Sequence, residues 1–92
     1  MNISIKDSVL IVNFKGKKDR MNATLDIISN AYEGIIKNRE GHNFPADLIP
    51  VGHVLSKYKK QCQYVVGIYN TNSLSHELRH AKYFMDRRYK RK

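Results

Sequence analysis

The chain has 92 residues, a formal net charge of +9 and a single cysteine. This length suits one small domain with a modest core, and one cysteine excludes an internal disulfide framework. No apolar run approaches the roughly 18 residues of a transmembrane helix, and the first residues lack the layout of a signal peptide. We therefore expect an intracellular protein, cytoplasmic or nuclear and of host or viral origin, whose charge attracts polyanions.

The first half of the chain predicts a strand segment and then a helix. Residues 3–14 are rich in β-branched and apolar side chains, which indicates a strand or a hairpin that turns at Asp7 and Ser8. The apolar residues that follow recur every three or four positions, which is typical of an amphipathic helix. We expect this helix near residues 22–39, with Asn22 as its cap.

The second half predicts a loop, two strands and a last helix. Residues 41–50 contain two prolines and indicate an ordered loop, and residues 51–58 indicate a second strand. The segment 62–70 is the strongest strand in the sequence because it is rich in Tyr, Val and Ile. Capping residues at 71–73 then predict a helix over residues 74–89.

The predicted order of elements is β-α-β-β-α, which defines a small α+β fold. We expect residues 1–86 to form a single domain and residues 87–92 to form a basic C-terminal tail.

The residues from His76 to His80 spell H-E-x-x-H on the last predicted helix. Positions i and i+4 lie one turn apart on the same face, so both imidazoles can reach one Zn²⁺ ion at about 2.0–2.1 Å. At about 100° per residue, the histidine pair lies opposite the apolar face of the helix. We expect the pair on an exposed surface, with Glu77 at its flank, and the following residues against the core: Leu74, Leu78, Ala81 and Met85.

This motif, on a helix after a strand, resembles that of the zincin metallopeptidases, and the order of elements resembles the N-terminal half of a zincin domain. The resemblance implies a peptidase in which His76 and His80 bind Zn²⁺ and Glu77 handles the proton of the attacking water. It also implies that the strand at 64–70 binds an extended peptide or protein substrate. Tyr83, on the histidine side of the helix, would donate a hydrogen bond to the oxyanion.

The third metal ligand is less well defined by the sequence. A catalytic zinc site normally has three protein ligands, and the metzincin branch has His or Asp six residues after the second histidine, which implies Asp86 here. A straight helix would carry Asp86 about 9 Å beyond His80, so this role requires a helix break, and Tyr83 stands where that branch has glycine. A second copy in a homo-oligomer is one alternative source, and the upstream candidates are His53, His42, Asp47 and Glu33.

A second hypothesis is a small basic protein that binds nucleic acid or is structural, with a non-catalytic H-E-x-x-H helix. Lysine and arginine gather in three clusters, within residues 15–20, 57–60 and 87–92. Such clusters can bind phosphates, and nearby tyrosines can stack on bases. The two hypotheses are compatible if nucleic acid recruits the enzyme.

Overall fold

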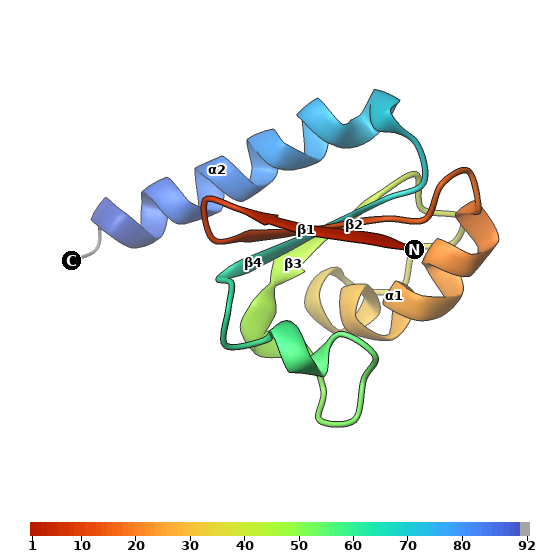
Figure 1. Ribbon diagram of the computed structural model, residues 1–92, viewed down its shortest axis with the longest axis horizontal. Coiled ribbons are helices and arrows are strands. Elements are labelled where there is room, and N and C mark those ends of the chain that lie inside the picture. Colours follow the sequence, from red (N-terminus) through yellow and green to blue (C-terminus); the bar gives the residue numbers. More distant parts are fainter. Residues whose placement is uncertain (91–92) are drawn as a thin grey trace.

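The computed structural model describes the backbone of residues 1–90 and the side chains of residues 1–86. Two helices lie on opposite faces of a four-stranded mixed sheet (Figure 1). The order of elements is β-β-α-β-β-α. This confirms the predicted α+β class with the H-E-x-x-H helix last, and it resolves the first predicted strand into a hairpin.

The hairpin consists of β1 (Asn2–Lys6) and β2 (Val9–Asn13), which pair in antiparallel fashion. Asp7 and Ser8 connect the strands with φ angles of 52° and 67°. Two consecutive residues in the left-handed region form the kind of turn whose twist matches that of a hairpin. The predicted turn at these two residues is therefore confirmed.

Helix α1 (Lys18–Glu33) both begins and ends earlier than the expected range of 22–39. Its N-cap residue, Lys17, makes no side-chain capping bond, so the sequence carries no strong start signal. Asn22 is not a cap. It lies inside the helix, buried, and its amide faces the core. Gly34, with φ 93°, ends the helix because glycine adopts this conformation without steric cost.

The loop expected after α1 contains a strand, and the strand expected at residues 51–58 is absent. β3 (His42–Pro45) is a short edge strand. Residues 51–58 instead form turns and a 3₁₀ helix at Ser56–Tyr58, with Gly52 at φ 86°. Val51 is 97% exposed. A β-branched residue in this segment therefore has no sheet neighbour to pack against.

Strand β4 (Tyr64–Ile68) lies inside the sheet, whose order is β1-β2-β4-β3. It pairs in parallel with β2 and antiparallel with β3, and all five of its residues are buried. Both of its edges are therefore occupied. The expectation that this segment pairs with a peptide through its backbone is wrong, because only β1 and β3 have a free edge.

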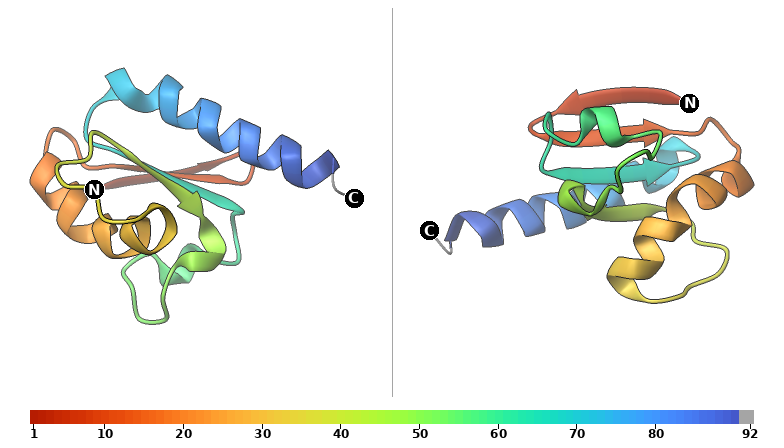
Figure 2. Two further views of the ribbon diagram at one scale, coloured as in Figure 1. Left: turned by 180° about the vertical axis from the view of Figure 1, so that it is seen from behind. Right: turned by 90° about the horizontal axis from the view of Figure 1, so that it is seen from below.

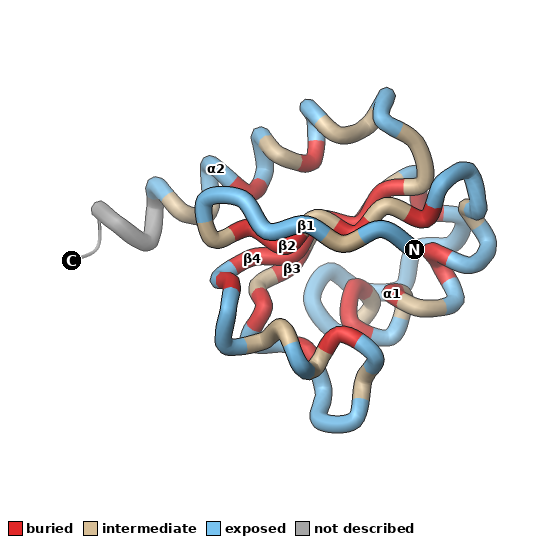
Figure 3. Tube along the Cα trace, viewed as in Figure 1, coloured by how far each residue is buried: buried red, intermediate tan, exposed pale blue. Residues whose placement is uncertain are grey.

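Each face of the sheet packs against one helix, as the views from behind and below show (Figure 2). On the α1 face the largest buried side chains include Leu10, Leu25 and Phe44. On the other face, α2 (Leu74–Lys90) packs Ala81 and its apolar neighbours against β2 and β4. Burial follows the sheet and the inner sides of both helices (Figure 3).

Helix α2 matches the predicted range of 74–89 closely, and Leu74, Leu78 and Ala81 lie on the core side as expected. In the part of the chain that the structure describes, no helix has both the length and the apolar character needed to cross a membrane.

Candidate metal centre

A short connection fixes how α2 lies on the sheet. After β4, the side chain of Asn70 accepts a hydrogen bond of 2.9 Å from the backbone N–H of Asn72, and residues Thr71–Ser73 form a 3₁₀ turn. The helix begins at once, and the nearly complete burial of Ala81 anchors it. This orientation leaves His76 and His80 exposed to solvent, as the helical wheel predicts.

The two histidines are spaced as one metal ion requires. Their Nε2 atoms lie 3.2 Å apart, and the ring planes meet at 77°. Tetrahedral ligation with bonds of about 2.0–2.1 Å places two nitrogens about 3.3–3.4 Å apart. The distance within the pair is therefore close to that of two ligands on one ion, and without an ion one ring can donate its Nε2–H to the other.

Glu77 completes a group that could hold a metal ion. One ligand atom from each of His76, Glu77 and His80 lies within 4.8 Å of the others. Glu77 itself is only 5% exposed, although the sequence places it at the flank of an exposed face. One position around the helix is enough to bring its carboxylate against β3 instead of into solvent.

A chain of hydrogen bonds connects Glu77 to the sheet. Its Oε1 accepts a bond of 2.9 Å from the Asn43 side-chain amide of β3. The Tyr64 hydroxyl of β4 donates to Asn43 Oδ1 at 2.6 Å. Burial raises the pKa of Tyr64, so its hydroxyl stays protonated and remains a donor. Sequence reasoning missed Asn43 and Tyr64 because no local pattern connects them with Glu77.

The structure does not bring Asp86 to the histidine pair. Helix α2 continues without a break through Lys90, so the interruption that Asp86 would need does not occur. Asp86 is exposed and lies outside the His76–Glu77–His80 group.

Tyr83 lies on the histidine side of the helix, as expected, and is 64% exposed. It lines a shallow surface hollow of about 370 Å³ together with His76, Arg79 and His80. Its proposed hydrogen bond to an oxyanion stays a prediction. Arg79, whose identity the H-E-x-x-H pattern leaves open, places a cation at the edge of the same hollow.

The upstream candidates for a third ligand have other surroundings. The His53 ring lies against α1, with Nε2 at 2.9 Å from the carbonyl oxygen of Thr24, and its Nδ1 accepts a bond of 3.1 Å from the Leu55 N–H. Both nitrogens therefore stabilise the loop. Among the described residues, the other candidates also lie outside the metal-binding group: His42, Asp47 and Glu33.

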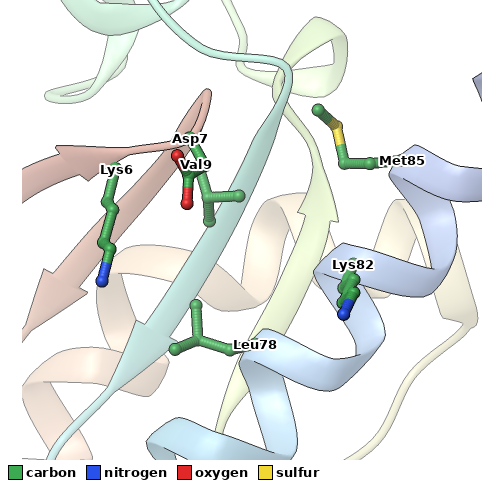
Figure 4. A pocket seen from close by; sticks show the side chains of 6 residues that line it. All are labelled: Lys6, Asp7, Val9, Leu78, Lys82 and Met85. Carbon is green, nitrogen blue, oxygen red and sulfur yellow. The ribbon is translucent and has the colours of Figure 1, made fainter.

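A second hollow lies on the other side of α2, between the helix and the β1–β2 hairpin (Figure 4). Its volume is about 430 Å³, and its lining combines apolar side chains with charged ones: Lys6, Asp7, Val9, Leu78, Lys82 and Met85. It shares no lining residue with the hollow beside the histidines.

Comparisons of the chain with protein-family models, with curated proteins and with solved structures find no match. The case for a function therefore rests on the geometry of the residues themselves.

Proposed function

We propose that the protein is a minimal zinc-dependent metallopeptidase that resembles the zincins, with His76 and His80 as metal ligands. The observation that carries this proposal is the 3.2 Å separation of the two Nε2 atoms, with the Glu77 carboxylate in the same cluster. Imidazole nitrogen is a preferred ligand of Zn²⁺.

The residues around the pair have distinct roles in this proposal. A bound zinc ion would polarise the carbonyl group of a peptide bond and lower the pKa of water. Glu77 would accept the proton of the attacking water and return it to the leaving amine. Tyr83, in the same hollow, would donate its hydroxyl hydrogen to the oxygen that becomes negative.

The substrate in this proposal is a peptide or protein in extended form. Because β4 has no free edge, the strand that can pair with a peptide beside α2 is β3. Asn43 of β3 contacts Glu77, so a peptide on this edge would pass close to the cluster. Backbone pairing gives affinity with little choice of sequence, and the net charge of +9 favours acidic substrates.

Two histidines leave positions open on a four-coordinate ion. Because His76 and His80 are exposed, a second copy of the chain can also supply a ligand. The ratio of metal to protein distinguishes a site within one chain from a site shared by two chains. One zinc ion per chain indicates a site completed by water or by this chain. One ion per two chains indicates a site shared in a homodimer.

The test combines metal analysis with peptide cleavage in three proteins. The parent and Glu77→Gln should bind zinc, whereas His80→Ala should not. Turnover of a fluorogenic peptide library should fall by at least about 10²-fold in Glu77→Gln, the usual scale for loss of a general base. Cleavage that is as fast in Glu77→Gln as in the parent would contradict the mechanism, and a parent protein that takes up no zinc would contradict the site.

A second candidate function, nucleic-acid binding, is favoured by the net charge of +9. Lys57 and Lys60 are exposed, and Lys57 lies 5.3 Å from the centre of the Tyr58 ring. In the cluster at residues 15–20, Lys18 is paired with Glu40 at 2.6 Å. The side chains of the cluster at 87–92 lie outside the described residues.

Salt dependence tests this candidate. Binding to a nucleic acid through phosphates should weaken steeply as the salt concentration rises. It should also be unchanged in Glu77→Gln. Negligible binding at low salt would remove this function.

A further inference from the structure

We infer that Asn43 is a positioning residue that fixes the Glu77 carboxylate beside the metal-binding histidines, with Tyr64 and Gly41 as its supports. This inference rests on the proposed function for its consequence in catalysis. The arrangement itself joins β3, β4 and α2, and it can be tested in the metal-free protein.

Glu77 is a buried carboxylate that needs a partner. Acidic side chains are almost never buried unless they are paired, because loss of water is costly for a charge. Among the described residues no cationic side chain forms an ion pair with Glu77. The hydrogen bond of 2.9 Å from Asn43 Nδ2 is what compensates for its burial.

Tyr64 fixes the direction in which Asn43 points. A carboxylate only accepts hydrogen bonds, so the amide nitrogen of Asn43 must face Glu77 and its oxygen must face Tyr64. The Tyr64 hydroxyl donates to that oxygen at 2.6 Å, and Tyr64 is 2% exposed. The three groups therefore form one chain of donors that ends on the carboxylate, and a flipped amide would lose its bond to the carboxylate.

Gly41 supplies the space for the second carboxylate oxygen. A Cβ atom at this position would lie 2.6 Å from Glu77 Oε2, which is closer than atoms can approach without displacement. One oxygen is thus held by Asn43 and the other lies against the Gly41 backbone. The carboxylate is fixed near the histidines and is not free to rotate into solvent.

A fixed carboxylate suits a base better than a mobile one. A positioned group reaches a reacting water without a further loss of rotamer freedom. Replacement of an outer hydrogen-bond partner at a metal site typically changes affinity or activity by 10–100-fold. We expect an effect on this scale when Asn43 loses its amide, and the effect should act through Glu77 alone.

A double-mutant cycle tests this coupling. Asn43→Leu should lower peptide turnover by about tenfold or more. In a Glu77→Gln background the same substitution should have little further effect. Equal effects in both backgrounds would show that Asn43 acts on the fold in general, and would overturn the inference.

A metal-free measurement separates this inference from the proposed function. In ¹⁵N NMR spectra, one side-chain N–H of Asn43 should be shifted by its bond to the carboxylate, and the shift should disappear in Glu77→Gln. Tyr64→Phe should disturb the same signal, whereas Tyr58→Phe, a matched change on the other face of the sheet, should not. An Asn43 signal that is unaffected by Glu77→Gln would overturn the positioning role. A protein that fails to bind metal but shows the shift would overturn only the peptidase.

Discussion

The His42 imidazole and the Ser29 hydroxyl are joined in the core, with Nδ1 of His42 at 2.6 Å from Oγ of Ser29. The other ring nitrogen, Nε2, lies 2.7 Å from Asn22 Oδ1. Because the Asn22 amide nitrogen donates to the carbonyl oxygen of Arg39 at 3.3 Å, its oxygen is the acceptor for His42. Burial lowers the pKa of His42 to about 4, so the ring is neutral with its hydrogen on Nε2, and Ser29 donates to Nδ1.

This Ser-His-Asn arrangement is structural. Ser29 and His42 are each 1% exposed, so no substrate can reach the hydroxyl. The group lies on the α1 face of the sheet, away from His76 and His80, and it connects α1 to the edge strand β3.

Acidification should destabilise the fold through His42. Burial, followed by the charge of Arg39, lowers the pKa of His42 from 6.5 to about 4. Because the folded pKa lies below the unfolded one, the unfolded chain takes up the proton first. The contribution is complete above pH 6.5, and stability should fall by about 3 kcal/mol in total as the pH drops from 6.5 to about 4. Urea unfolding at several pH values measures this loss of stability. A His42→Gln variant with the same pH dependence as the parent would show that His42 is not its cause.

Ser8→Gly should stabilise the protein by about 0.5–1 kcal/mol, because Ser8 has a φ angle of 67° and glycine adopts that conformation without strain. Ser4→Gly is the matched control, since Ser4 lies in the middle of β1 and glycine weakens a strand. Thermal and urea unfolding should move in opposite directions for the two variants. A loss of stability in both would show that the turn is not under strain.

Gly41→Ala should destabilise the protein by about 1–3 kcal/mol, the usual cost of overpacking. Its Cβ would displace the Glu77 carboxylate, whose Oε2 lies 2.6 Å from that point. In a Glu77→Ala background the same change should cost much less, because the obstacle is gone. If the cost is equal in both backgrounds, the contact between these residues does not determine it.

Zinc should stabilise the parent against heat, and His80→Ala should abolish the effect. At about 100 times its Kd, a ligand that binds only the folded state contributes about 2.7 kcal/mol, which raises the Tm of a domain this small by roughly 10 °C or more. His53→Gln is the control, since it also removes an imidazole but one that is bonded to Thr24 and Leu55. His53→Gln should keep the zinc-induced rise in Tm, even if its Tm without zinc is lower. A zinc-induced rise in Tm that survives in His80→Ala would place the metal elsewhere.

The sequence predicts best the elements whose signals are local. The hairpin turn and the range of α2 follow from turn residues and helical periodicity, which act over a few positions. The exposure of His76 and His80 also follows from helical spacing alone. These features need no knowledge of the rest of the chain.

The predictions that were wrong concern features that depend on contacts between residues far apart in the sequence. β3 carries only four residues, one of them proline, and it is a strand only because β4 lies beside it. Residues 51–58 have strand-like composition, but Gly52 has a φ angle of 86° and the segment forms turns and a 3₁₀ helix. The burial of Glu77 was missed because its partner Asn43 lies 34 positions earlier in the chain.

The central place of β4 determines when the fold can form. The β1–β2 hairpin and β3 have no contact within the sheet until β4 joins them, and its parallel register pairs Val9 with Tyr64, more than half the chain away. Closure of this long loop is slow compared with helix formation. We therefore expect a single late folding step in which the sheet closes and α2 docks. Peptide turnover in a refolding experiment should return only after sheet formation for the same reason, since Asn43, Tyr64 and Glu77 come together only at that step.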